Sequence, residues 1–110
     1  MLAKSKGDTN MARQVSEQTA RAFFNHHNMR LSNTEVKDDK FYLFGNCIAK
    51  FEDNELYVRF VYNSNTTRER LNTLGDIGGY NIKATQKNFI PYLNGNRIDN
   101  EMAWVKVNKV

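Results

Sequence analysis

The chain has 110 residues, of which 40% are hydrophobic and 25% are charged, and its formal net charge is +4 at pH 7. This composition is typical of a globular domain and excludes an intrinsically disordered chain. No apolar run reaches the roughly 18 residues of a membrane-spanning helix, and the first ten residues lack the apolar core of a secretory signal. The single cysteine cannot form an internal disulfide. We therefore expect a cytoplasmic protein without membrane contact.

The first regular pattern is a helix near the N-terminus. Residues 1–10 are small, polar and aperiodic, which predicts a disordered tail ahead of a single α+β domain over residues 11–110. From Met11 to Phe23, apolar and small side chains recur every three or four residues, so one face of this helix is apolar. The pattern ends near residue 27, where weak helix formers gather.

Three strand segments follow the helix. Residues 41–44 and 47–51 flank the Gly45-Asn46 pair, which favours a two-residue type II′ turn because glycine accepts positive φ at its first central position. Residues 53–54 predict the next turn. Residues 55–62 alternate and are rich in aromatic and β-branched side chains, which is typical of a strand. Together these segments predict an antiparallel meander.

A second helix is predicted from its start signal. Thr66 and Glu69 form an S/T-x-x-E capping box, in which each side chain accepts a hydrogen bond from an otherwise unpaired backbone N–H. Gly75 can adopt the left-handed conformation that ends a helix. The predicted helix is therefore about ten residues long, close to the average length of helices in globular proteins.

Three more strand segments complete the chain. We predict strands at residues 80–85, 89–93 and 102–107, with a type I′ hairpin turn at Asn94-Gly95. Pro91 has no backbone N–H to donate, so we expect its strand to lie at a sheet edge or to contain a bulge.

The two halves of the chain resemble each other. Residues 42–48 and 92–98 share tyrosine, leucine, glycine, asparagine and isoleucine at positions fifty apart. We therefore predict two helices packed on an antiparallel β-meander sheet and interpret the repeat as a tandem duplication of a helix and a meander. The alternative is that two unrelated hairpins use the same turn chemistry.

Several of these motifs also resemble a known family pattern. The segments are Leu43-Phe44-Gly45-Asn46, Asn65-Thr66-Thr67-Arg68 and Tyr92-Leu93-Asn94-Gly95. Across residues 33–97 the chain is similar to small uncharacterised proteins of tailed bacteriophages. The resemblance implies expression in an infected bacterium, and hence the host cytoplasm, but it implies no activity.

The reactive residue types favour structural roles. His26 and His27 are adjacent, so on a helix their side chains diverge by about 100° and cannot readily share one metal ion. Cys47 lies in a predicted strand without a nucleophile motif around it. We therefore expect no enzyme, no catalytic residue, no metal ligand and no cofactor. The acidic residues at predicted turns are expected to be solvated: Asp38, Asp39, Glu52, Asp53 and Glu55.

The candidate binding residues are aromatic and basic side chains that share strand faces. Tyr57 and Arg59 lie on one face of their strand by alternation, as Trp104 and Lys106 do on theirs. Arg68 on the second helix is expected to extend this basic surface, together with Arg70. The alternative is that the rest of the chain packs over these side chains.

Exposed aromatic and basic residues favour a non-enzymatic binding protein that acts on a host or viral protein, because such residues dominate protein interfaces. The alternative is nucleic-acid binding through the same face, with bases stacked on the rings. The sequence leaves the identity of the partner and the oligomeric state open.

Overall fold

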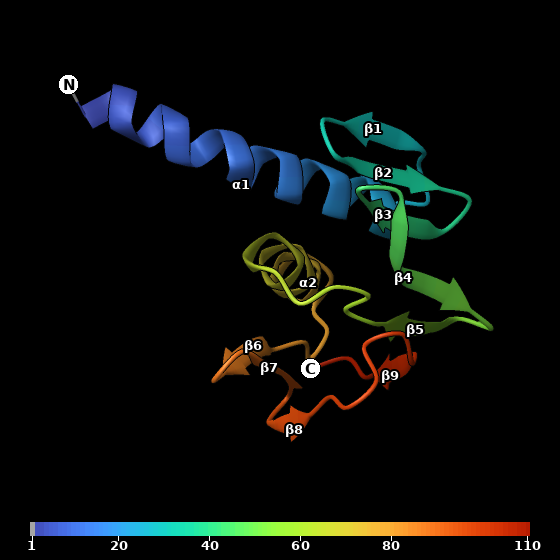
Figure 1. Ribbon diagram of the computed structural model, residues 1–110. Helices are drawn as coiled ribbons and strands as arrows, with labels where there is room; N and C mark the ends of the chain where they lie inside the picture. Colours follow the sequence, from blue (N-terminus) through green and yellow to red (C-terminus); the bar gives the residue numbers. More distant parts are fainter. Residues whose placement is uncertain (1) are drawn as a thin grey trace.

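The computed structural model describes the backbone of residues 2–110 and the side chains from Arg13 onward. Two helices pack against a six-stranded antiparallel sheet, and a small three-stranded sheet completes the α+β fold (Figure 1). Within the described chain, no helix is both long and apolar enough to cross a membrane.

The strands of the large sheet are almost all joined by short hairpins. Their order in the sheet is β1-β2-β3-β4-β5-β9, so only β9 comes from a distant part of the sequence. The small sheet has the order β6-β7-β8. The large sheet contains β1 (Met29–Leu31), β2 (Thr34–Lys37), β3 (Lys40–Leu43), β4 (Asn46–Glu52), β5 (Glu55–Val58) and β9 (Val105–Val107), and the small sheet contains β6 (Ala84–Lys87), β7 (Ile90–Leu93) and β8 (Asn96–Arg97).

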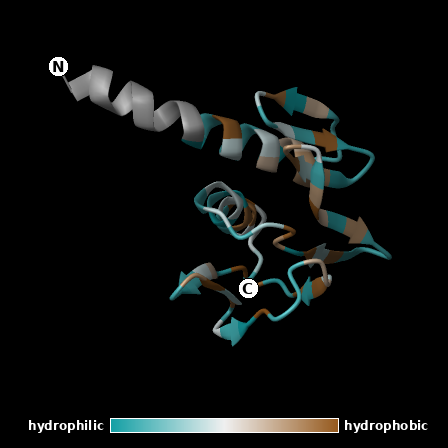
Figure 2. Ribbon diagram, in the orientation of Figure 1, coloured by the Kyte–Doolittle hydropathy of each residue, from teal (hydrophilic) through white to brown (hydrophobic). Residues whose placement is uncertain are grey.

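One face of the large sheet forms the core with the helices. Leu56 and Val58 on β5 are fully buried, as the alternation of that strand predicts. Phe23 of α1 stacks on Phe51 at 4.8 Å between ring centroids and meets Phe41 edge-on at 5.8 Å. Burying a phenylalanine side chain contributes about 2 kcal/mol. Hydrophilic colours mark the outer ends of several hairpins (Figure 2).

Helix α1 spans Leu2–Phe24, so it starts upstream of the helix start predicted at Met11. Thr19 and Phe23 are buried, as the helical pattern predicts. The side chains of residues 1–12 lie outside the described part of the structure. The division of the chain into a tail and a domain therefore stays a prediction.

Helix α2 spans Asn65–Gly78, and both of its predicted ends are wrong. Ser64, rather than Thr66, is the N-cap, and its hydroxyl oxygen accepts a hydrogen bond from Thr67 N at 3.1 Å. The helix also continues through Gly75, where a Cβ would lie 3.0 Å from Ile82 Cβ. Gly79 ends the helix with φ 73°.

In most of the hairpins, a two-residue turn connects the two strands. Asp53-Asn54 and Asn94-Gly95 form the predicted turns, each with positive φ at both central residues, as a type I′ turn requires. The turn predicted at Gly45-Asn46 is wrong by one position, because its central residues are Phe44 and Gly45. Strands β1, β2 and β8 were not predicted, and β1 and β2 are joined at Ser32-Asn33.

Pro91 lies in the middle strand of the small sheet, so the prediction of an edge strand is wrong. Proline is tolerated because β8 ends at Arg97, just before the position opposite Pro91. The Pro91 carbonyl still accepts a hydrogen bond from Ile98 N at 2.9 Å. Pro91 therefore lies just beyond the end of the ladder between β7 and β8, although β7 itself is not an edge strand.

The strand pairing repeats with an offset of fifty residues. Leu43 pairs with Asn46 and Leu93 with Asn96, at the same position beside each turn. All pairs of β2 with β3 recur fifty positions later between β6 and β7. This common register supports the interpretation of the two meanders as a duplication. The small sheet joins α2 through Asn72, whose side chain bonds both the N–H and the carbonyl of Ala84.

Candidate functional site

The outer face of the large sheet carries the candidate binding residues. The pairing of β4, β5 and β9 places Lys50 opposite Tyr57 and Tyr57 opposite Lys106. These three side chains form a row across three strands, on the face opposite the buried Leu56 and Val58. Tyr57 and Lys106, which the sequence analysis assigned to two separate strands, are therefore direct neighbours.

Trp104 joins this row through contacts with two cations. The Arg59 guanidinium carbon lies 4.1 Å from the Trp104 ring centroid, and Lys50 Nζ lies 4.6 Å from it. Lys50 Nζ also lies 5.9 Å from the Tyr57 ring. Both rings are partly exposed, so the protein's own atoms do not enclose them. We call these five residues, Lys50, Tyr57, Arg59, Trp104 and Lys106, the cation–aromatic cluster.

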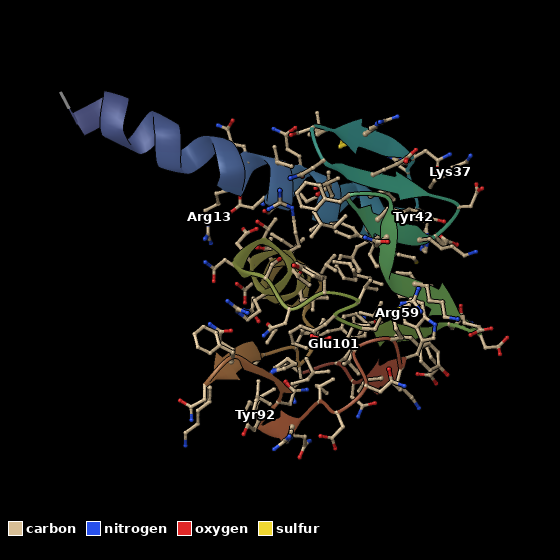
Figure 3. All side chains as sticks on the ribbon, in the orientation of Figure 1. Arg13, Lys37, Tyr42, Arg59, Tyr92 and Glu101 are labelled. Carbon is tan, nitrogen blue, oxygen red and sulfur yellow. The ribbon has the colours of Figure 1, made fainter. Side chains whose placement is uncertain are left out.

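Backbone carbonyls hold Arg59 in place. Its Nε donates to Cys47 O at 2.8 Å and its Nη1 to Met102 O at 3.2 Å. Within the described chain, Nη2 donates to no protein group. Arg59 thus combines a fixed orientation with a free donor, which is an arrangement suited to binding a carboxylate or a phosphate. Arg59 is labelled on the strand side of the molecule, together with Lys37 and Tyr42 (Figure 3).

Two glutamates accompany the lysines of the cluster. Glu52 Oε1 lies 3.1 Å from Lys50 Nζ, and Glu55 Oε1 lies 3.6 Å from Lys106 Nζ. Each pair is partly solvent-exposed, so each contributes only about 0–1 kcal/mol to stability. A carboxylate of a partner could therefore replace Glu52 or Glu55 as the ion-pair partner of the lysine at a small cost in free energy.

The rest of this face is also basic. We define the outer sheet face as the strand residues that alternate with the core positions, together with the adjoining Arg59 and Trp104; none of them is buried. It has six basic and three acidic side chains, a net charge of +3. The basic ones are Arg30, Lys37, Lys40, Lys50, Arg59 and Lys106, and the acidic ones are Glu35, Glu52 and Glu55.

Sequence reasoning missed Lys50, although a signal for it was available. A two-residue turn at Asp53-Asn54 fixes the register of its hairpin, and that register places Lys50 opposite Tyr57. The alternation that would have revealed Lys50 is interrupted, because a bulge leaves Ile48 and Ala49 both buried.

The two arginines of α2 do not join the cluster. Arg68 hydrogen-bonds to Asn63 and Asn65, and its Nη1 lies 3.2 Å from Gln86 Oε1 on β6. Arg70 is only 5% exposed, so the expectation that it extends an exposed basic surface is wrong.

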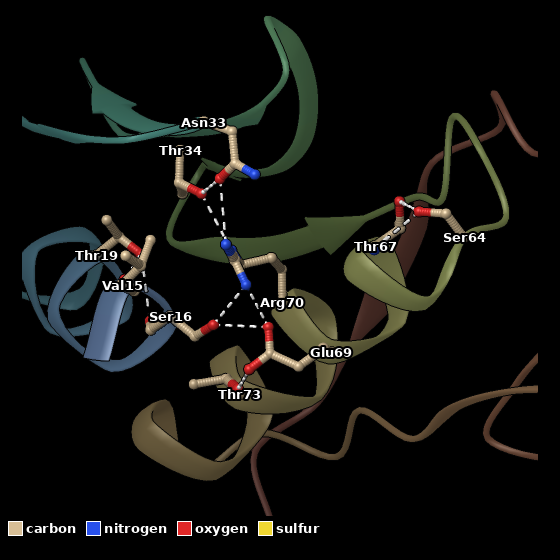
Figure 4. Close-up of polar contacts among 10 residues, drawn as sticks. All are labelled: Val15, Ser16, Thr19, Asn33, Thr34, Ser64, Thr67, Glu69, Arg70 and Thr73. Carbon is tan, nitrogen blue, oxygen red and sulfur yellow. Dashed lines mark hydrogen bonds and ion pairs between the residues drawn. The ribbon is translucent and has the colours of Figure 1, made fainter. Parts of the chain in front are cut away.

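Arg70 is instead the centre of a buried polar network (Figure 4). Its Nη1 donates to Ser16 Oγ on α1 at 2.7 Å, and its Nε to Thr34 Oγ1 at 3.0 Å. Nη2 donates to Asn33 Oδ1 at 3.1 Å, and Nη1 also pairs with Glu69. The network connects both helices with the turn between β1 and β2. Glu69, predicted to cap α2, is thus occupied in binding Arg70 and Ser16.

The remaining reactive side chains have ordinary partners. Burial raises the pKa of the Cys47 thiol, although the nearby Arg59 charge opposes this. A raised pKa means less thiolate at neutral pH, which is unfavourable for a nucleophile. His26 Nδ1 lies 2.8 Å from Asp39 Oδ1, so these two side chains pair with each other. Among the described residues, no group of three or more histidine, cysteine or acidic side chains could hold a metal ion.

Comparison with known proteins identifies a family that the chain matches. A family model described as Kyanoviridae Gp96 protein matches residues 12–110. This is a family of tailed cyanophage proteins, so the match confirms the resemblance found over residues 33–97 and extends it to both sides. No curated protein and no solved structure matches the chain.

Proposed function

The chain belongs to the Kyanoviridae Gp96 family of tailed-phage proteins, and from this premise we propose that it is a non-enzymatic binding protein. Its outer sheet face binds an acidic segment of a host or phage protein in the cytoplasm of the infected cell. One observation carries this proposal: the two cations against the Trp104 ring lie on a basic sheet face that is free of buried side chains.

The chemistry of the cluster favours a protein partner. Trp, Tyr and Arg are the residue types that contribute most to protein interfaces. Because Arg59 is already oriented by two backbone carbonyls, less side-chain entropy is lost when it binds a carboxylate. The net charge of +3 on the outer sheet face selects acidic partners and accelerates their association.

Nucleic acid is the second candidate, supported by the same excess of positive charge. Bases stack on aromatic side chains that offer an open ring face. Here Arg59 and Lys50 already contact the Trp104 ring, so a base would have to displace at least one of them. For this reason we rank the protein partner first.

Variants of the cluster test the lead proposal. Arg59→Gln and Trp104→Ala remove the oriented cation and the ring, and the control Arg97→Gln removes an exposed arginine outside the cluster. With the partner that wild type captures from infected cells, each cluster variant should lose about 30-fold in affinity, since interface hot spots contribute about 2 kcal/mol or more. The control should bind as wild type. Cluster variants that fold and keep wild-type affinity would refute the proposal.

Salt dependence separates the two partner classes. A single-stranded oligonucleotide bound by this face should dissociate steeply with salt, with a log–log slope of roughly −0.7 for each phosphate contacted. If the fluorescence of Trp104 reports such binding and Arg59→Gln abolishes it, the nucleic-acid candidate replaces the protein partner. If no oligonucleotide binds at low salt, the second candidate is eliminated.

A further inference from the structure

A pocket of about 530 Å³ lies away from the cation–aromatic cluster and shares no residue with it. It is formed where the C-terminal ends of both helices meet the turns at residues 38–39 and 53–54. This volume falls within the usual range of small-molecule sites, about 300–1,000 Å³. The lining residues used below are Phe24, Asp39, Phe51, Asp53, Tyr80 and Lys109.

Aromatic rings form one wall of the pocket. Phe24 stacks on Tyr80 at 5.7 Å between ring centroids and meets Phe51 edge-on at 5.8 Å. Gly78 allows Phe24 to lie against α2, because a Cβ at that position would be only 2.1 Å from Phe24 Cζ. The wall is therefore a packed structure, and its negative ring faces attract cations.

The helix ends add negative potential. Helix α1 ends at Phe24 and α2 at Gly78, and both residues line the pocket. The C-terminus of a helix carries a partial negative charge. The last turn of α2 contains no basic residue that would offset this charge, whereas the last turn of α1 contains Arg21.

The charged side chains that line the pocket also favour a bound cation. Asp39 pairs with His26, whereas the Asp53 carboxylate has no hydrogen-bond or ion-pair partner among the described residues. Lys109 Nζ lies 5.7 Å from the Tyr80 ring, so the aromatic wall already attracts one cation of the chain itself. With His26 counted as neutral, the two carboxylates that line the pocket, Asp39 and Asp53, outnumber its one lysine.

We propose that this pocket binds an organic cation, an ammonium or guanidinium group carried on a short apolar stem. The stem packs on Phe24 and Phe51, and the cation takes the place of the Lys109 ammonium against the Tyr80 ring, beside the Asp53 carboxylate. The ligand is either a free amine or the lysine or arginine side chain of a peptide, since both present this chemistry.

A ligand titration of the full chain, monitored by the NMR chemical shifts of its backbone amides, tests the proposal. The probes are n-butylammonium and n-butylguanidinium, with 1-butanol as the neutral control of similar length. We expect both cations to shift the amides of Asn54 and Gly78 in a saturable way and to bind at least tenfold more tightly than 1-butanol. Equal binding of 1-butanol, or absence of saturable shifts with either cation, would overturn the proposal.

Two variants complete the test. Asp53→Asn removes the free carboxylate but suits the left-handed turn, where φ at this position is 54°, so the fold should persist. It should weaken cation binding severalfold, whereas Asp99→Asn, an exposed carboxylate outside the pocket, should not; equal affinities of both variants would contradict the proposal. A capped lysine peptide that binds more tightly than n-butylammonium supports a side-chain ligand, and the reverse order supports a free amine.

Discussion

At the scale of single residues, Arg70 has the largest predicted effect on stability. Removing one partner of a buried ion pair leaves the other groups unsatisfied and costs about 3–5 kcal/mol. Because Glu69 is partly exposed, we expect the lower end, a loss of about 3 kcal/mol for Arg70→Met in urea unfolding. Arg68→Met on the same helix should lose less than about 1 kcal/mol. Similar losses for both variants would contradict a central role for Arg70.

The Cys47 thiol allows a test by pH. Burial raises its pKa, so at any given pH the folded protein contains less thiolate than an unfolded chain. Alkylation by iodoacetamide should therefore be slow at pH 8 and accelerate only above the usual thiol pKa, with the rate increasing on denaturation. Arg59→Gln removes the charge that opposes this shift, so it should slow alkylation further. A native rate at pH 8 equal to the denatured rate would disprove the burial argument.

Residue roles could be predicted where they follow from strand alternation. Alternation placed Tyr57 and Arg59 opposite Leu56 and Val58, and the structure confirms this division. Arg70 could not be found in this way, because this buried arginine depends on acceptors from two distant segments, Ser16 on α1 and the adjacent Asn33 and Thr34. No local pattern of the sequence contains that information.

At the scale of elements, the turns are the most instructive feature. Phe44 occupies the first central position of a type I′ turn with φ 51° and is 65% exposed, although asparagine is preferred there. The equivalent residue of the second meander is Asn94, whose side chain accepts a hydrogen bond from Lys83 N at 2.7 Å. The two hairpins thus differ in how well their residues suit the turn.

This difference predicts that Phe44→Asn stabilises the protein. The left-handed conformation costs an ordinary L-residue about 1 kcal/mol more than asparagine, so the free energy of unfolding should rise by about that amount. Phe44→Leu, which keeps the unfavourable conformation, should give no gain. Thermal unfolding of the three proteins measures both effects, and a destabilised Phe44→Asn would contradict this reading of the turn.

Elements could be predicted from the sequence where they carry a strong signal, and their ends could not. The turn at Asp53-Asn54 is confirmed, and the strand that follows begins at Glu55 as predicted but ends at Val58 rather than at residue 62. The start of α2 was misplaced because Ser64 and Thr66 are both good caps, and the tertiary contacts of Glu69 decide between them. Strands β1 (MRL) and β2 (TEVK) were missed because neither contains an aromatic residue of the kind that marked the predicted strand segments.

At the scale of the whole molecule, the fold separates a core face from a basic face of one sheet. Both helices and the small sheet contribute to the core, whereas the outer sheet face has a net charge of +3 and no buried side chain. Strand β9 returns from the C-terminal part of the chain and brings Trp104 and Lys106 beside Tyr57 and Arg59. This long-range pairing was not predictable from local patterns, and it turns two separate aromatic and basic pairs into one cluster.

Quenching of tryptophan fluorescence tests this arrangement most directly, because Trp104 is the chain's single tryptophan. Cations beside the ring should concentrate iodide and repel caesium, so iodide should quench Trp104 severalfold more strongly than caesium. Lys50→Gln should reduce that difference, whereas Lys83→Gln, an exposed lysine outside the outer sheet face, should leave it unchanged. Caesium quenching as strong as that of iodide, or an unaltered ratio in Lys50→Gln, would contradict a partly exposed ring among positive charges.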